Sequence, residues 1–288
     1  MFEGVYTALI TPFDKDGGVN FDHLRSLVEY QIDGGVDGLV PVGTTGESPT
    51  LNVDEHTRVI ETVIEVAAGR VKVVAGTGGN STTEALALTR AAKDAGADGT
   101  LQVTPYYNKP SQKGLIHHFQ SVADIGLPIV LYNVPGRTSL ELAVDTVVEL
   151  SRHPNITTIK EAAGNVDRVS LYRRLCDIEV VSGDDALTLP MISVGGVGVI
   201  SVASNVAPKA VVAMVHGALQ GDWQAAQALH AKYHALFTNL FLDTNPIPVK
   251  AALAMMGRAD EIYRLPLCPM DDAKKQVLRE TMQALGLL

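Results

Sequence analysis

The stretch Pro128-Ile-Val-Leu-Tyr132 decides the fold class, because every residue between its proline and its tyrosine is apolar. A strand with one solvated face alternates apolar and polar side chains, whereas a strand of a parallel sheet is covered on both faces and reads as apolar throughout. Lys72-Val-Val-Ala-Gly76 has the same character. Short β-branched segments recur near residues 5, 39, 72, 99, 128, 156, 179 and 197, with helical patterns in most of the gaps. This alternation predicts an α/β fold with eight strands.

The strand signal stops after about residue 222, where an alanine-rich helical pattern runs from Trp223 to Leu240 and leads to a loop at Asp243–Val249. We therefore predict a (β/α)8 TIM barrel over residues 1–224 and a C-terminal α-helical domain over residues 225–288. Doubly wound sheets share the alternation and stay an alternative at this point. Two helix starts have the spacing of a capping box, Ser81-Thr-Thr-Glu84 and Asn52-Val-Asp-Glu55.

The charge balance favours a small-molecule substrate. The chain has 23 Lys and Arg against 32 Asp and Glu, a net charge of -9, so its surface should repel nucleic acid and anionic membranes. Residues 186–208 carry no charged side chain, but Pro190 and the Gly195-Gly196 break divide them into a short helix and a buried strand rather than a membrane span.

The two cysteines, Cys176 and Cys268, form no CxxC pair and no cluster with histidine, so they give no metal signal and fit a reducing compartment. A disulfide between them stays an open alternative. The segment Met1–Pro12 lacks a basic region and a long apolar run, so we expect no signal peptide and predict a cytoplasmic protein.

Lys160 is the most informative single residue, because it interrupts the apolar strand pattern of Asn155-Ile-Thr-Thr-Ile-Lys-Glu-Ala-Ala163. An ammonium at a strand end inside an α/β domain loses hydration, which favours the neutral amine. A neutral amine attacks a carbonyl carbon to form a Schiff base. The alternative is a lysine that snorkels from the strand end into solvent.

The ends of other predicted strands also carry side chains suited to substrate binding or proton transfer. Active sites of barrel enzymes are assembled from residues at these positions. Gly43-Thr44-Thr45-Gly46 offers hydroxyl and N–H donors suited to a small carboxylate, or is simply a tight βα turn. Tyr106 and Tyr107 follow the fourth strand, while Tyr132 and Arg137 follow the fifth. A tyrosine can relay a proton, and an arginine can hold a second carboxylate. Interface packing for the tyrosines and a surface salt bridge for the arginine are the structural alternatives.

Four segments resemble the dihydrodipicolinate synthase (4-hydroxy-tetrahydrodipicolinate synthase) family, a member of the pyruvate-dependent class I lyases and aldolases that include N-acetylneuraminate lyase. The resemblance extends from Met1 to the carboxyl terminus and rests on Gly43-Thr-Thr-Gly-Glu-Ser48, Tyr132-Asn-Val-Pro-Gly-Arg137, Ile159-Lys-Glu-Ala162 and Asn245-Pro-Ile-Pro-Val-Lys250. It implies the condensation of pyruvate with L-aspartate 4-semialdehyde on the diaminopimelate route to L-lysine. A lyase that forms pyruvate from a sugar acid is the alternative within the wider group.

The resemblance also implies roles for individual residues. Lys160 would form the Schiff base, and Thr44, Tyr132 and Tyr107 would relay protons, with Tyr107 reaching into a neighbouring subunit of a homotetramer built as a dimer of dimers. Thr44 and Thr45 would bind the carboxylate of pyruvate, and Arg137 that of the semialdehyde. Gly183 and Ile200 would line the pocket. No cofactor and no metal are expected, because the imine nitrogen is the electron sink.

A feedback site for L-lysine matches in part, through Ser48, Pro49, His56, Asn80, Glu84 and Tyr106. Glu84 also has a structural interpretation as the capping-box partner of Ser81, and His56 lies on an ordinary amphipathic helix. Position 53 is Val53 where some inhibited relatives have histidine, which bears on the strength of inhibition.

Two other classes of function, an oxidoreductase and a regulatory protein without activity, are less well supported. Gly76-Thr-Gly-Gly-Asn-Ser81 follows a predicted strand like a dinucleotide fingerprint, but serine stands at the third glycine position and Asp98 precedes the next strand instead of ending it. A catalytically silent regulatory barrel is disfavoured, because the lysine, the tyrosines and the arginine occur together.

Overall fold

The eight predicted strands close into a parallel barrel. The computed structural model describes residues 1–288, and each strand pairs in parallel with its two sequence neighbours, β8 closing onto β1. This confirms the TIM barrel and excludes the doubly wound sheet. The strands are β1 (Gly4–Ala8), β2 (Gly38–Val40), β3 (Lys72–Gly76), β4 (Gly99–Val103), β5 (Ile129–Asn133), β6 (Ile156–Glu161), β7 (Glu179–Ser182) and β8 (Gly198–Ser201).

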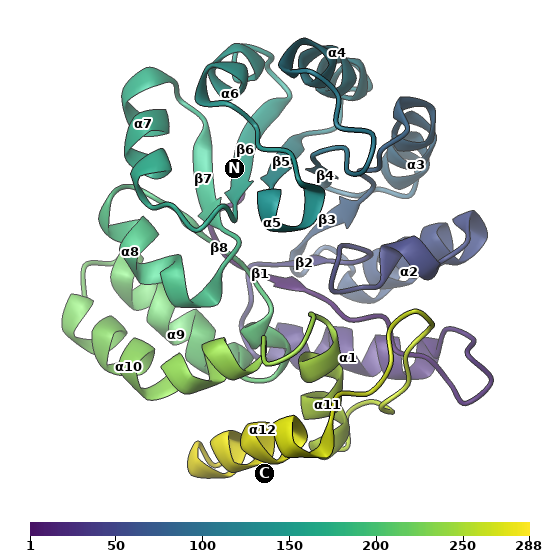
Figure 1. The fold of residues 1–288 in the computed structure, drawn as a ribbon, viewed down its shortest axis with the longest axis vertical. Helices are drawn as coiled ribbons and strands as arrows, with labels where there is room; N and C mark the ends of the chain where they lie inside the picture. Colours follow the sequence, from purple (N-terminus) through teal and green to yellow (C-terminus); the bar gives the residue numbers. More distant parts are fainter.

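A ring of helices surrounds the barrel and buries the outer faces of the strands (Figure 1). The main helices of this ring are α1 (Phe21–Asp33), α2 (Val53–Ala67), α3 (Thr82–Asp94), α4 (Gln112–Ala123), α6 (Val144–Leu150), α7 (Asp167–Leu175), α8 (Thr188–Ser193) and α9 (Pro208–Leu219). Short helical turns lie in the loops after four strands: η1 (Ser48–Thr50), α5 (Pro135–Thr138), η2 (Asp185–Leu187) and η3 (Ala203–Asn205).

Three helices extend the chain beyond the barrel, namely α10 (Trp223–Asn239), α11 (Ile247–Met255) and α12 (Asp272–Ala284). Helix α10 packs on α9, and α12 packs on α10 and α11 at one side of the barrel (Figure 1). The loop expected at Asp243–Val249 is shorter than predicted, because α11 already begins at Ile247. We propose the division at residues 224 and 225 as the domain boundary, which falls in the first turn of α10.

One of the two capping boxes forms completely. Asn52 accepts a hydrogen bond from the backbone N–H of Glu55 at 2.9 Å, and Glu55 accepts one from the backbone N–H of Asn52 at 3.1 Å. At Ser81, the serine oxygen accepts from the backbone N–H of Glu84 at 3.4 Å, but the reciprocal bond from the Glu84 side chain is absent. The prediction of a full box at Ser81 is therefore wrong, and the Glu84 carboxylate faces a cavity described below.

The uncharged stretch 186–208 divides into α8 and β8 as predicted. None of the helices combines the length and the apolar character that a bilayer span requires.

The glycines of the dinucleotide-like segment have a structural reason to be small. A Cβ atom at Gly76 would lie 2.3 Å from the backbone oxygen of Val42, and one at Gly78 would lie 2.3 Å from the backbone nitrogen of Val103. These contacts join neighbouring strands and loops of the barrel. The segment is thus explained by close backbone packing, without a pyrophosphate ligand.

Candidate active site

A cavity of about 390 Å³ opens at the carboxyl ends of the barrel strands. Its lining includes six of the eight residues to which the sequence assigned a catalytic or substrate-binding role. They come from the turn after β2, from β5 and the short helix α5, from β6, and from the residue after β7, and they are Thr44, Thr45, Tyr132, Arg137, Lys160 and Gly183.

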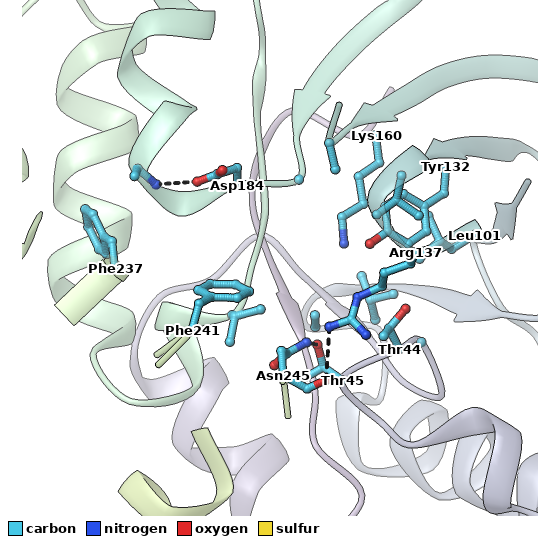
Figure 2. A pocket seen from close by; sticks show the side chains of 18 of the residues that line it. Thr44, Thr45, Leu101, Tyr132, Arg137, Lys160, Asp184, Phe237, Phe241 and Asn245 are labelled. Carbon is cyan, nitrogen blue, oxygen red and sulfur yellow. Dashed lines mark hydrogen bonds between the residues drawn. The ribbon is translucent and has the colours of Figure 1, made fainter. Parts of the chain in front are cut away.

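Lys160 is the penultimate residue of β6, and its side chain points into the barrel (Figure 2). The residue is 5% exposed, and its Nζ atom lies 4.3 Å from the centre of the Tyr132 ring. The pairing of β5 with β6 places Tyr132 directly opposite Lys160. No carboxylate pairs with this amine, whereas the other buried lysine, Lys250, forms an ion pair with Glu47. An unpaired, enclosed amine next to a phenol is suited to nucleophilic attack on a ketone.

Gly183 gives Lys160 room. A Cβ atom at residue 183 would lie 3.0 Å from Cε of Lys160 and 2.7 Å from Cβ of Ala162. A side chain there would require Ala162 or Lys160 to shift, so the absence of a side chain at Gly183 is part of the site's geometry.

Asn245 joins the two proposed carboxylate-binding groups. Its side-chain amide donates to Oγ1 of Thr45 at 3.0 Å, and its backbone oxygen accepts from the Arg137 guanidinium at 3.1 Å (Figure 2). The side-chain oxygen of Asn245 is buried and has no hydrogen-bond partner in the protein. Thr45 and Arg137 are thereby held on one wall, where the arginine's other N–H groups remain free for an anion.

The sequence did not assign a role to Asn245, and it also missed Phe237, Thr238 and Phe241, which line the same cavity. All four lie on α10 or between α10 and α11, about 200 residues from the Thr44-Thr45 turn. The one local signal at Asn245 is an Asn-Pro dipeptide, which indicates a turn and does not show where the turn lies.

Two of the assigned residues are outside this cavity. Ile200 is 2% exposed and packs in the barrel interior, in the same apolar cluster as Tyr132. Tyr107 is 91% exposed and has a φ of 71°, a left-handed conformation that is unfavourable for a bulky side chain. Within one chain, Tyr107 therefore does not reach the amine of Lys160.

A second cavity, of about 170 Å³, is lined by Ser48, Pro49, His56, Glu84 and Tyr106. Asn80 does not line it, but the Asn80 side-chain amide donates to the backbone oxygen of Tyr106 at 3.2 Å. A third cavity, of about 190 Å³, lies between the other two. It shares Thr44 and Tyr132 with the cavity at Lys160, and Ser48 and Tyr106 with the second cavity, so the three spaces adjoin.

The electrostatics of the second cavity suit a cationic ligand. Burial lowers the pKa of His56, whose Nε2 lies 2.8 Å from the backbone oxygen of Gly76. A neutral imidazole in that place donates from Nε2 and presents Nδ1 as an acceptor. Burial and the Glu84 carboxylate both raise the pKa of Tyr106, which keeps its phenol protonated. Glu84 supplies the only negative side chain of the lining.

No group of three or more His, Cys, Asp or Glu side chains is arranged to hold a metal ion. Cys176 and Cys268 are both free thiols, so the disulfide left open by the sequence does not form.

Comparison with known proteins identifies a family and full-length relatives. A sequence profile of the Dihydrodipicolinate synthetase family matches residues 1–285. The 4-hydroxy-tetrahydrodipicolinate synthase of Methanococcus maripaludis (strain C6) is 51% identical over 288 residues, which is 99% of each chain.

Two solved structures bear on regulation and assembly. Dihydrodipicolinate synthase from Cyanidioschyzon merolae with lysine bound has a TM-score of 0.97 at 42% identity, over 100% of this chain and 99% of that one. A dihydrodipicolinate synthase variant described as monomeric has a TM-score of 0.97 at 41% identity, over 100% of this chain and 98% of that one.

Proposed function

The chain belongs to the dihydrodipicolinate synthetase family and condenses pyruvate with L-aspartate 4-semialdehyde to 4-hydroxy-tetrahydrodipicolinate, and we propose that Lys160 carries this reaction as a Schiff base. The observation behind the proposal is the enclosed Lys160 amine, which has no ionic partner and lies against Tyr132 in a cavity that also holds two groups suited to carboxylates. The product is the first committed intermediate of the diaminopimelate route to L-lysine.

In the proposed mechanism, the Lys160 amine attacks the ketone carbon of pyruvate, and water leaves to give an imine. The protonated imine withdraws electrons, so a methyl proton is lost and an enamine forms. The enamine carbon attacks the aldehyde carbon of the semialdehyde, whose oxygen takes up a proton. The semialdehyde's own amine then displaces Lys160 from the imine carbon, which closes the six-membered ring and frees the lysine.

Thr44, Tyr132 and Tyr107 are proposed as the proton relay. Tyr132 already lies against Lys160, and Thr44 lines the same cavity. Tyr107 would complete the relay from a neighbouring subunit, a role that its 91% exposure and left-handed backbone support. We propose a homotetramer, a dimer of dimers, in which two subunits exchange this tyrosine. Full activity from a species that sedimentation identifies as a monomer would contradict the exchange.

Arg137→Ala is expected to raise the KM for the semialdehyde by about 10- to 100-fold, the loss of one charge-assisted contact, and to change the KM for pyruvate little. The reason is that Arg137 would meet the carboxylate of the second substrate, while Thr44 and Thr45 bind that of the first. Steady-state kinetics with each substrate varied in turn measure both constants.

Thr45→Val is the matched variant, because it removes a hydroxyl at the other carboxylate position and should affect pyruvate more. Equal damage to both constants in Arg137→Ala would contradict the assigned role. The relatives named as synthases favour this reaction over cleavage of a sugar acid, the alternative kept open by the sequence.

We further propose that L-lysine binds in the cavity between Ser48, His56, Glu84 and Tyr106 as a feedback inhibitor. The side-chain ammonium group of the L-lysine ligand would face the Glu84 carboxylate, which is the only negative group of that lining. Calorimetric titration should detect binding at concentrations up to about 1 mM, and Glu84→Ala should weaken it. Absence of heat from the parent protein over that range would contradict the proposal.

We propose a cytoplasmic location, which the two free thiols and the acidic surface support. No nucleic-acid or membrane partner is proposed.

A further inference from the structure

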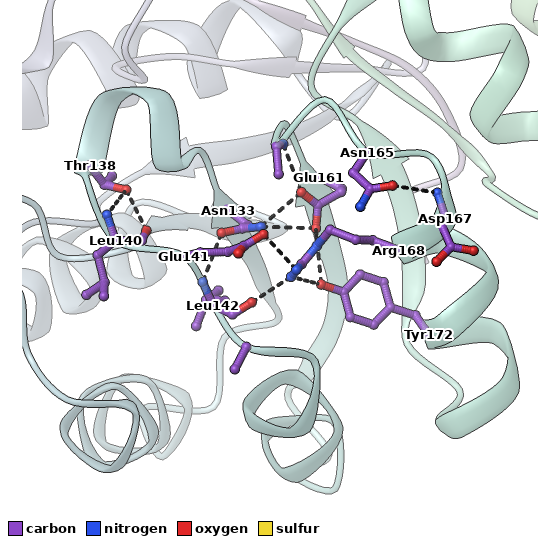
Figure 3. A network of polar contacts seen from close by, with 12 residues as sticks. Asn133, Thr138, Leu140, Glu141, Leu142, Glu161, Asn165, Asp167, Arg168 and Tyr172 are labelled. Atoms are coloured by element: carbon purple, nitrogen blue, oxygen red, sulfur yellow. Dashed lines mark hydrogen bonds and ion pairs between the residues drawn. The ribbon is translucent and has the colours of Figure 1, made fainter.

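A polar network joins the ends of β5 and β6 to helix α7 through Asn133, Glu161, Arg168 and Tyr172 (Figure 3). Successive residues of a strand point to opposite faces, so Asn133 and Glu161 point away from the cavity that Tyr132 and Lys160 face. The strand pairing places Asn133 opposite Glu161, as it places Tyr132 opposite Lys160. Both Asn133 and Glu161 are completely buried.

The Glu161 carboxylate is bound by four donors. It accepts from the side-chain amide of Asn133 at 2.9 Å, from Nε of Arg168 at 2.9 Å, from the Tyr172 hydroxyl at 3.1 Å and from the backbone N–H of Ala163 at 2.9 Å. Burial and the Glu161 charge raise the pKa of Tyr172, so its hydroxyl remains a donor. A buried carboxylate held by so many fixed groups has little freedom to move.

Arg168 extends the network to the loop that carries Arg137. Its guanidinium donates to the backbone oxygen of Leu142 at 2.6 Å, and the side-chain oxygen of Asn133 accepts from the backbone N–H of Leu142 at 3.0 Å. These two bonds close the base of the loop between residues 133 and 142. The network therefore contacts the ends of the two strands that carry Tyr132 and Lys160 and the base of the loop that carries Arg137.

The pairing of β5 with β6 contains an irregularity, so a fixed contact further along the two strands would help to hold their register. Ile129 pairs with Ile156, whereas the next residue, Val130, pairs with Thr158, so β6 has one extra residue here. A slip of one residue beyond this point would turn Lys160 to the outer face of the sheet. The pairing of Asn133 with Glu161 occurs at the far end of the two strands, where it can fix the register.

We propose that Glu161 and Arg168 are positioning residues for the reaction, which act through Asn133 and the ends of β5 and β6 to hold the amine of Lys160 against the phenol of Tyr132. This inference rests on the proposed role of Lys160. It predicts that disturbing the network slows imine formation even in protein that remains folded.

Glu161→Gln tests the inference, because glutamine keeps the shape of the side chain but replaces one accepting oxygen by an NH₂ group. That NH₂ group would face donors instead of accepting from them. The rate of imine formation with pyruvate alone, measured by quenching with borohydride at successive times, is expected to fall about 10- to 100-fold at saturating pyruvate. The KM for pyruvate should change little, since Thr44 and Thr45 are in the turn after β2 and form no hydrogen bond with the residues of the network. Tyr172→Phe, which removes one hydroxyl and no charge, is expected to cause a smaller fall and is the test if Glu161→Gln does not fold.

Asp37→Asn is the matched control for lost stability. Asp37 accepts from the backbone N–H of Val5 at 2.7 Å, and its carboxylate lies 2.7 Å from Nε2 of His216. Asp37 precedes the start of β2 and is therefore at the opposite end of the barrel. It should lower the thermal midpoint and leave the imine rate unchanged. If the parent is trapped by borohydride but Glu161→Gln, or Tyr172→Phe in its place, reacts at the parent's rate, the inference is wrong. If the parent itself is not trapped, the proposed function fails instead.

Discussion

Replacing Lys160 by alanine is expected to lower kcat by about 10⁴-fold or more, because the variant lacks the nucleophile and no neighbouring side chain can form the covalent intermediate. The Lys160 amine is the only one in the lining of the cavity. The measurement is the pyruvate-dependent consumption of L-aspartate 4-semialdehyde by purified protein.

Lys160→Arg is the matched control for side-chain size. It keeps a long basic side chain in the same place, but a guanidinium remains protonated and does not form the imine, so its activity should be as low as that of Lys160→Ala. Circular dichroism should show that both variants are folded. Substantial activity in either variant would contradict the Schiff-base mechanism.

Lys250→Met is expected to reduce the free energy of unfolding by about 3–5 kcal/mol, because it leaves the buried Glu47 carboxylate without its partner. Both side chains of this pair are completely enclosed, with 2.5 Å between Nζ and the carboxylate oxygen, and Nζ also lies 4.2 Å from the centre of the Phe13 ring. Burial lowers the pKa of Lys250, while the Glu47 charge opposes that shift. Urea denaturation of the parent and the variant measures the difference.

The double variant Glu47→Gln with Lys250→Met is the control, since it removes both charges and should regain much of the lost stability. Glu47 follows the Thr44-Thr45 turn with a φ of 55°, and it also accepts from the backbone N–H of Arg264 at 3.3 Å. The pair thus fixes the turn that would bind pyruvate against α11. A double variant as unstable as Lys250→Met would show that the unpaired carboxylate is not the cause.

Features with a local cause could be predicted from the sequence. Residues Ile129, Val130 and Leu131 of β5 are apolar because both faces of the strand are covered, and that burial is visible in its composition. Lys160 stood out because a charged residue in such a run needs a reason. In the same way, the complete capping box at Asn52 follows from a fixed spacing within one turn of helix.

Features that depend on the meeting of distant segments could not be predicted. Asn245 lies beside Thr45 only because the segment between α10 and α11 folds over the mouth of the barrel. The partners of Glu161 come from three separate segments, and its sequence neighbour Lys160 gave no sign of them. The reciprocal bond at Ser81 also depends on tertiary context, since the Glu84 side chain faces a cavity instead of turning back to the helix start.

Mass spectrometry of the protein after borohydride reduction tests the central claim most directly. With pyruvate present, the intact mass should increase by that of one reduced pyruvate adduct per chain, and peptide mapping should find the adduct on Lys160. An unchanged mass, or an adduct on a different side chain, would contradict the account.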